Sequence, residues 1–295
     1  MKKLKRRRNE KSSYIMHVNY MEQGQSIEEI CEKAVKLGFD GVEFRCKMKN
    51  MDDEAYLEKL AMSVEKSKLK YVIFGAPGPN LMLPEKDKRE KEIEEAVNFY
   101  RKAAKYFKLT VCNTMTGPLI NPSYPYYHYE KHGSNYGNEE HWEWAVEGFK
   151  ILGDIAEELG FYFAFETHMC YLHDTHLSTK KLVDLIDKKY VGINLDYGNI
   201  ICFKEPPSLD EVIKICSDKL YYVHLKNLFK VNGIEYGNII SCALEDGIIN
   251  NREFLKLLKE TNYKGPICIE APRNGDREYF AKQDISYLKS VLEEI

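Results

Sequence analysis

The 295-residue sequence lacks several patterns that would each define a class of protein. No apolar run approaches the length of a membrane-spanning helix, and no apolar region of a secretory signal follows the basic start KKLKRRRNEK. Neither a GxGxxG nor a P-loop sequence follows an apolar run, which disfavours a nucleotide-binding sheet. A net charge of −3 gives no electrostatic basis for binding nucleic acid. We therefore expect neither a membrane nor a nucleic-acid partner.

The eight cysteines form no CxxC pair, so the sequence also lacks a common metal-binding and redox motif. Several of them, including Cys31, Cys216 and Cys268, lie within apolar patterns. This distribution predicts reduced, buried thiols in a cytoplasmic protein rather than a disulfide framework. Cys170 is a minor candidate for a catalytic thiol because it lies close to the candidate site described next.

The most informative stretch is FYFAFETHMCYLHDTH, at residues 161–176. Five apolar, mostly aromatic residues indicate a fully buried strand, and Glu166 follows them. A carboxylate at the end of a buried strand is costly unless charge or hydrogen bonds meet it. A salt-bridged structural glutamate is the alternative to a functional one. His173 and His176 fall in the loop expected after this strand, where surface and functional roles are equal alternatives.

The same pattern recurs three times downstream. GINLD ends at Asp196, LYYVHL carries His224, and PICIE ends at Glu270. Carboxylate oxygens with one imidazole suit a divalent ion such as Mn²⁺, Mg²⁺, Co²⁺ or Zn²⁺, and the absence of cysteine from these positions disfavours a structural zinc site. Each residue alone is weak evidence, but the four together predict a metal site.

Eight short apolar runs alternate with eight helical patterns along the chain. This rhythm predicts an α/β fold, a single (β/α)₈ TIM barrel over residues 14–295, preceded by a basic, disordered tail at residues 1–13. An open doubly wound sheet is the runner-up and lacks a nucleotide-binding motif to support it. The strands are expected near residues 14–18, 41–44, 69–75, 109–115, 161–166, 191–196, 220–225 and 266–270.

Residues 116–137 interrupt the alternation with proline, glycine, asparagine and many tyrosines. The stretch is too long for an ordinary connection, and loops of this length are usually functional or disordered. Its tyrosines disfavour disorder. We expect either a substrate-facing lid or a subunit contact, with His128 and His132 structural or exposed rather than metal ligands.

These motifs resemble the xylose isomerase-like TIM-barrel superfamily and, within it, the sugar phosphate isomerase/epimerase group, which includes tagatose and psicose 3-epimerases, hydroxypyruvate isomerases and inosose dehydratases. By position, the resemblance implies that Glu166, Asp196, His224 and Glu270 bind one metal. The sequence departs from the family at Asn199, where a histidine is common, and at Asn227, where an aspartate is common. Asn199 and the near-neutral charge disfavour the DNA-repair activity of related endonucleases. The resemblance rests on GFDGVEF (38–44), FAFETH (163–168), GINLD (192–196), VHLKN (223–227), ALEDGIIN (243–250) and GPICIEAPRNGD (265–276).

The resemblance implies a sugar or sugar phosphate isomerase or epimerase acting through a metal-stabilised enediolate, with Glu166 and Glu270 as base and acid. Manganese is the first expectation for the ion, with magnesium, cobalt or zinc as alternatives. A lyase or dehydratase acting at the same site is the second hypothesis, and a non-catalytic sugar-binding barrel is the third. The resemblance also implies a homo-oligomer, a dimer or tetramer.

Five further residues are candidates for binding the substrate. His168 follows Glu166 by two positions, so strand alternation would direct it into the barrel mouth. Glu43 would contact a sugar or pair with Arg45. Lys226 would meet a substrate oxyanion, with Arg273 as a weaker candidate for that role. The full set of expected substrate contacts is His168, Glu43, Lys226, Asn199 and Arg273.

Overall fold

The computed structural model describes residues 12–46, 51–235, 237–271 and 273–295. The expected basic tail at residues 1–13 therefore lies almost entirely outside the described residues. Within them, no helix has the length and apolar character needed to cross a membrane. None of the described cysteines forms a disulfide, and all but Cys202 are buried, as the sequence predicts.

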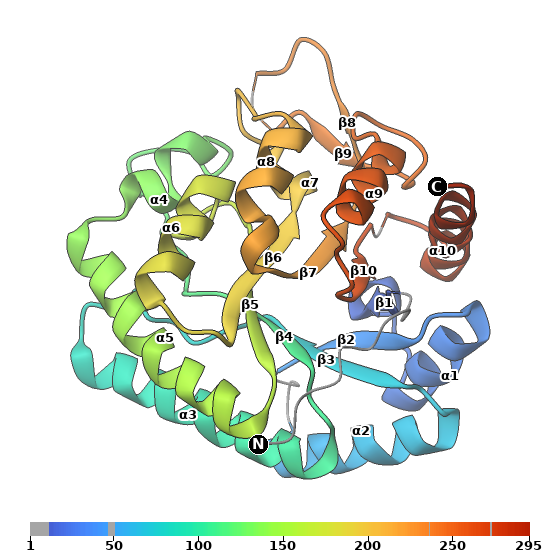
Figure 1. Cartoon of the computed structure of the whole chain (residues 1–295), viewed down its shortest axis with the longest axis horizontal. Helices are drawn as coiled ribbons and strands as arrows, with labels where there is room; N and C mark the ends of the chain where they lie inside the picture. Colours follow the sequence, from blue (N-terminus) through green and yellow to red (C-terminus); the bar gives the residue numbers. More distant parts are fainter. Residues whose placement is uncertain (1–11, 47–50, 236, 272) are drawn as a thin grey trace.

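Eight parallel strands form a nearly closed barrel that is surrounded by helices (Figure 1). The strand order is β3-β2-β1-β10-β7-β6-β5-β4, and the two edge strands, β3 and β4, lie side by side. The predicted (β/α)₈ fold is confirmed. The barrel strands are β1 (Tyr14–His17), β2 (Gly41–Arg45), β3 (Tyr71–Gly75), β4 (Val111–Thr114), β5 (Tyr162–Glu166), β6 (Val191–Asp196), β7 (Leu220–Leu225) and β10 (Ile267–Ile269).

Except for α3, the outer helices are preceded by residues whose side chains accept hydrogen bonds from free backbone N–H groups. Ser26 and Glu29 form the capping box that the sequence predicts, and Gly38 ends the helix with a φ of 91°. The outer helices are α1 (Ile27–Leu37), α2 (Asp53–Ser67), α3 (Lys86–Tyr106), α5 (Glu139–Leu159), α6 (His176–Ile186), α8 (Leu209–Cys216), α9 (Asn251–Glu260) and α10 (Arg277–Glu294).

Several short elements were not predicted from the sequence. They are the helices α4 (Gly133–Tyr136) and α7 (Tyr197–Ile200), the 3₁₀ turns η1 (Val18–Tyr20), η2 (Tyr129–Lys131) and η3 (Ser217–Lys219), and the hairpin strands β8 (Leu228–Lys230) and β9 (Ile239–Ser241). The hairpin pairs antiparallel and follows β7 at the carboxyl end of the barrel. The long 116–137 stretch contains α4 and η2, so it is an ordered segment.

Strand alternation separates two cores. Phe163 and Phe165 of β5 belong to the large core between strands and helices, whereas Ala164 belongs to a small cluster inside the barrel. Because successive strand residues point to opposite faces, Glu166 shares the inward face with Ala164. The same spacing places His224 beyond Tyr222 and Glu270 beyond Cys268, both of which belong to the inner cluster. The barrel therefore directs each of these polar side chains inward at its carboxyl end.

Arg273 does not reach this end of the barrel interior. Its Nη1 donates to Asp284 Oδ2 at 2.9 Å and to the carbonyls of Cys242 and Ala271. Asp284 is fully buried and also accepts a 2.7 Å hydrogen bond from the Tyr20 hydroxyl. The guanidinium is thus paired with a buried carboxylate, and binding of a substrate oxyanion by Arg273 stays a prediction.

Candidate metal centre

Four side chains meet at the carboxyl ends of β5, β6, β7 and β10. One ligand atom from each of Glu166, Asp196, His224 and Glu270 lies within 4.8 Å of the others. His224 Nδ1 is 2.9 Å from Glu270 Oε2, 3.8 Å from Glu166 Oε2 and 3.9 Å from Asp196 Oδ2. The first three residues are buried, and the Glu270 side chain is 17% exposed. The structure thus brings together the four residues that the sequence singles out.

This donor set fits a divalent cation. Three carboxylates and one imidazole match the ligand preferences of Mn²⁺, Mg²⁺, Co²⁺ and Zn²⁺. Asp196 Oδ2 is buried, and the Lys226 ammonium lies 2.7 Å from it. Burial raises the pKa of Asp196 to about 6, and the charge of Lys226 acts in the opposite direction. A divalent cation would also stabilise this carboxylate, and it would share the oxygen with the Lys226 ammonium.

Two amide side chains hold Glu166 in place. Asn199 Nδ2 donates to Glu166 Oε1 at 3.0 Å, and Asn113 Nδ2 donates to Glu166 Oε2 at 2.8 Å. Asn199 also donates to the Thr167 carbonyl, and its side-chain oxygen accepts from Lys226 at 3.2 Å. Asn199 is 4% exposed. We predicted a substrate contact for Asn199, but its polar atoms are all engaged within the protein, where they orient Glu166 and Lys226.

Glu43 lies beneath the four residues and binds His224 from the side opposite the candidate ion. Its Oε2 accepts from His224 Nε2 at 2.8 Å and from the Tyr222 hydroxyl at 2.7 Å. Burial favours a raised pKa for Glu43, but the charge and hydrogen bond of His224 outweigh it and lower that pKa. Glu43 is 1% exposed. Arg45 pairs with Glu22, so the expected pair with Glu43 does not form, and a sugar contact by Glu43 stays a prediction.

Lys226 inserts a positive charge among the candidate ligands. Its ammonium lies 2.7 Å from Asp196 Oδ2 and 3.3 Å from Glu270 Oε2. An added Cβ at Gly198 would lie 2.1 Å from Lys226 Cγ, so glycine at this position makes room for the lysine stem. Burial alone would lower the pKa of Lys226, but the charge of Asp196, followed by Glu270, raises it well above the usual value. Lys226 is therefore a permanent cation within the site.

His17 and Asn19 belong to the same site and were missed from the sequence. His17 Nε2 lies 3.8 Å from both Glu43 Oε1 and Glu270 Oε1, and Asn19 Nδ2 donates to Glu270 Oε1 at 3.2 Å. The signal was present, since β1 reads YIMH and ends on His17 as β5 ends on Glu166. A search for metal-binding side chains at the end of every predicted strand would have found this histidine.

The histidines after β5 have separate roles. His173 is fully buried, where its Nδ1–H donates to the Glu166 carbonyl and its Nε2 accepts from the Thr116 N–H. His176 is also buried, at the first turn of α6, so a surface role is wrong for both. His168 is half-buried, with its ring edge on Tyr171 and Nδ1 bonded to the Met169 carbonyl. Its role in substrate binding stays a prediction.

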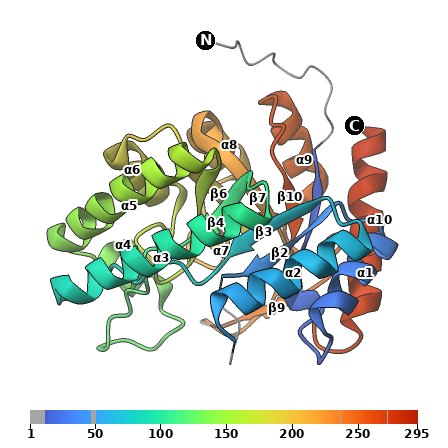
Figure 2. The same cartoon turned by 90° about the horizontal axis from the view of Figure 1, so that it is seen from below.

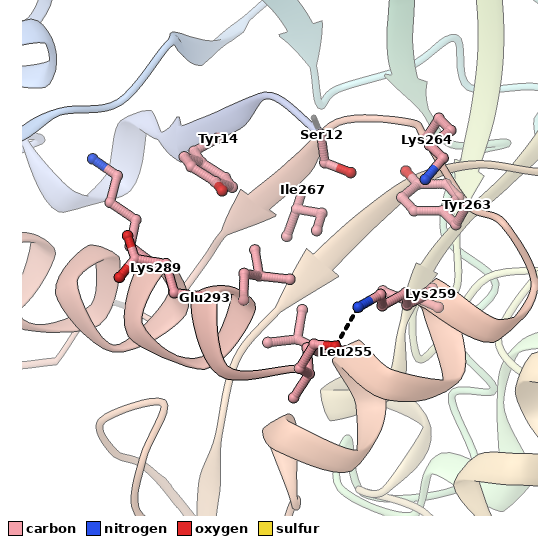
Figure 3. A pocket seen from close by; sticks show the side chains of 12 residues that line it. Ser12, Tyr14, Leu255, Lys259, Tyr263, Lys264, Ile267, Lys289 and Glu293 are labelled. Carbon is pink, nitrogen blue, oxygen red and sulfur yellow. Dashed lines mark hydrogen bonds between the residues drawn. The ribbon is translucent and has the colours of Figure 1, made fainter. Parts of the chain in front are cut away.

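A hollow of about 390 Å³ lies at the opposite end of the barrel (Figure 3). It is lined by Tyr14 and Ile267, the first residues of β1 and β10, and by Leu255 and Lys259 of α9. Catalysis in this fold takes place at the carboxyl ends of the strands. This hollow is therefore not part of the candidate site.

The model of the xylose isomerase-like TIM barrel family matches residues 31–291. The chain therefore belongs to the xylose isomerase-like TIM barrel family. Among curated relatives, an inosose dehydratase of Clostridium perfringens is 29% identical over 150 residues, which cover 46% of this chain and 49% of the relative. The chain thus spans about half the length of this curated relative.

Solved structures share the whole fold at low sequence identity. The 3-keto-D-glucoside 4-epimerase of E. coli has a TM-score of 0.73 at 14% identity, covering 95% of this chain and 100% of that one. A xylose isomerase-like TIM barrel protein from Mycobacterium smegmatis, in complex with magnesium, has a TM-score of 0.73 at 18% identity, covering 96% and 97%. At these identities the likeness establishes the fold.

The position of Lys226 predicts competition between its ammonium and a divalent cation. Lys226→Met should tighten Mn²⁺ or Mg²⁺ binding by about tenfold or more, because the carboxylates of Asp196 and Glu270 would no longer be shared with a neighbouring ammonium. Isothermal titration calorimetry of each ion measures this. Lys230→Met is the matched control, since it removes the same charge from an exposed position on β8. Unchanged or weaker binding in Lys226→Met, relative to wild type, would contradict the prediction.

The burial of His173 predicts a specific pH dependence of stability. Burial lowers the pKa of His173 to about 3, whereas an unfolded histidine titrates near 6.5. Between these values the unfolded chain binds a proton that the folded chain does not, so the free energy of unfolding falls as the pH falls.

Urea unfolding at pH 7.5 and pH 5.0 tests this contribution in wild type and His173→Gln. The glutamine does not titrate, so the variant should lose roughly 2 kcal/mol less than wild type between the two pH values. Other titrating groups are common to both proteins and cancel in the comparison. The same pH dependence in both proteins would refute the contribution assigned to His173.

Proposed function

We propose that this chain is a divalent-metal-dependent isomerase or epimerase that moves a proton on a sugar or sugar phosphate. The observation that carries the proposal is the convergence of Glu166, Asp196, His224 and Glu270 at the carboxyl end of the barrel. A family that includes sugar epimerases and dehydratases supports the reaction class. Manganese or magnesium is the proposed ion, and the magnesium complex of a structural neighbour is consistent with that choice.

The four side chains would hold the ion through their converging oxygens and His224 Nδ1. A bound divalent ion would supply Lewis-acid polarisation of the substrate carbonyl and of a neighbouring hydroxyl. Glu43 accepts the Nε2–H of His224 and thereby orients the ring, which leaves Nδ1 directed at the three carboxylates. Asn113 and Asn199 fix both oxygens of Glu166 in the same way. The side chains are therefore already in place, and the ion would displace the proton that His224 Nδ1 shares with Glu270 Oε2.

Two glutamates are available to move protons from different directions. Glu270 follows β10 and is partly exposed, so a substrate entering the barrel mouth can reach it. Glu166 ends β5, and each of its oxygens accepts one hydrogen bond, which leaves lone pairs for a proton. Removal of a proton by one glutamate and its return by the other would invert a carbon centre, whereas return to the neighbouring carbon would interconvert an aldose and a ketose.

Lys226 would stabilise the negative charge that develops on a substrate oxygen. Its ammonium is held by Asp196, Glu270 and Asn199 rather than by solvent. A fixed positive charge in a buried site stabilises developing charge without reorganisation. Its raised pKa makes it unsuited to act as a base, so its contribution is electrostatic.

Dehydration is the second candidate function, and the sequence relatives favour it. The inosose dehydratase of Clostridium perfringens shares 29% identity over the matched region. The first step would be the same proton removal, followed by loss of a β-hydroxyl group as water. His168, which is half-buried in the loop after β5, is the proposed acid for that leaving group.

Product analysis distinguishes the two reactions. Proton NMR in D₂O, with ketoses, aldoses and inososes and with added Mn²⁺ or Mg²⁺, should show an isomer or epimer that has gained deuterium at the reacting carbon. A product that has lost water would select the dehydratase.

Glu270→Gln should reduce turnover by about 10² to 10⁴ and weaken metal binding, while Glu205→Gln, which alters an exposed loop, should not. Full turnover in Glu270→Gln would overturn the proposed mechanism.

A further inference from the structure

A small hollow lies beside the candidate metal centre, where three loops meet. Its volume is about 110 Å³, comparable to one six-membered ring. The segment 116–137 contributes Tyr127 and Glu130, the chain after α7 contributes Cys202 and Phe203, and the β8–β9 hairpin region contributes Lys230 and Asn238. Figure 2 shows this segment and the hairpin extending from the same side of the barrel.

Aromatic rings form one wall of this hollow. Tyr127 and Phe203 line it, and the ring centroid of Tyr129 lies 6.2 Å from that of Tyr127 and 6.1 Å from that of Phe203. Tyr129 is 5% exposed and anchors the group, whereas Tyr127 is 54% exposed and borders the hollow. Gly237 packs against the Tyr127 ring, since an added Cβ there would lie 3.2 Å from Tyr127 Cγ, and the exposed remainder of the ring is the apolar surface offered to a ligand.

The hollow adjoins the proton-transfer site through Cys202. The Cys202 side chain lines the hollow, and its thiol donates to the Gly198 carbonyl at 3.2 Å. Gly198 packs directly against the stem of Lys226. Burial raises the pKa of the Cys202 thiol to about 12; the charge of Lys226 acts to lower this pKa, and the charge of Asp196 acts to raise it. A molecule held by the metal ligands and Lys226 could therefore extend into the hollow.

We propose that this hollow is a subsite for a second six-membered ring, joined by a glycosidic bond to the sugar that reacts. The substrate class is then a glycoside rather than a free monosaccharide, which deepens the proposed function and rests on it. Tyr127 and Phe203 provide surfaces on which a ring can stack. Glu130, Lys230 and Asn238 provide hydrogen-bonding groups for its substituents.

Ligand binding to the metal-loaded full chain tests the subsite. The probes share one sugar and differ in the second ring: methyl β-D-glucopyranoside has none, p-nitrophenyl β-D-glucopyranoside has an aromatic ring, and cellobiose has a sugar ring. Saturation-transfer NMR and calorimetric titration measure contact and affinity. At least one two-ring probe should bind roughly three- to tenfold more tightly than the methyl glycoside. Whether the p-nitrophenyl glucoside or cellobiose binds more tightly shows whether the hollow accepts an aromatic ring or a sugar ring.

Tyr127→Ala should remove this advantage. Tyr124→Ala is the matched control, because Tyr124 is an exposed tyrosine of the same segment that stacks with Lys131 outside the hollow. Equal affinity for all three probes, no binding of any of them, or an advantage that persists in Tyr127→Ala would overturn the subsite. So would sedimentation showing that Tyr127→Ala only dissociates an oligomer, since Tyr127 would then be a subunit contact.

The outcomes separate this inference from the proposed function. Metal-dependent deuterium exchange on free sugars, without any gain from a second ring, would remove the subsite and leave the proposed function. A second-ring advantage in a protein that catalyses no exchange would retain the subsite and remove the proton-transfer chemistry proposed beside it.

Discussion

The site depends on the burial of four carboxylates around one imidazole inside the barrel. Glu43, Glu166, Asp196 and Glu270 lie close together at low exposure, and isolated buried charges of one sign are costly. Two cationic groups offset this cost. Burial acts to lower the pKa of His224, but the surrounding carboxylates raise it well above its usual value, and Lys226 contacts two of the acids directly. The remaining negative charge favours a divalent cation.

This electrostatic constraint explains the hydrogen-bonding residues around the four candidate ligands. Asn113, Asn199 and Asn19 donate to the glutamates, while His173 joins the backbone carbonyl of Glu166 to the end of β4. Each donor compensates part of the cost of a buried acceptor and fixes its orientation. The same rigidity suits proton transfer, where small displacements of a base reduce the rate.

The sequence predicts the barrel and the four candidate ligands because both follow from local periodicity. The inward position of Glu166 follows from two-residue alternation along β5, and the capping box of α1 can be read from Ser26 and Glu29. The partners of Glu43 could not be predicted, because His224 is 181 residues away and meets Glu43 only after the barrel closes. The hydrogen bond from Arg273 to the carbonyl of Cys242, 31 residues earlier, could not be predicted from local periodicity either. The hairpin β8–β9 was missed because its three-residue strands have no alternating pattern.

The central claim is that the four converging side chains form a metal site, and metal content tests it most directly. The wild-type protein is incubated with Mn²⁺, Mg²⁺, Co²⁺ or Zn²⁺, desalted and measured by inductively coupled plasma mass spectrometry beside Glu166→Ala and Asp196→Ala. Our interpretation predicts about one ion per chain in the wild type and its loss in both variants. A wild-type protein that stays metal-free, or variants that keep their metal, would contradict it.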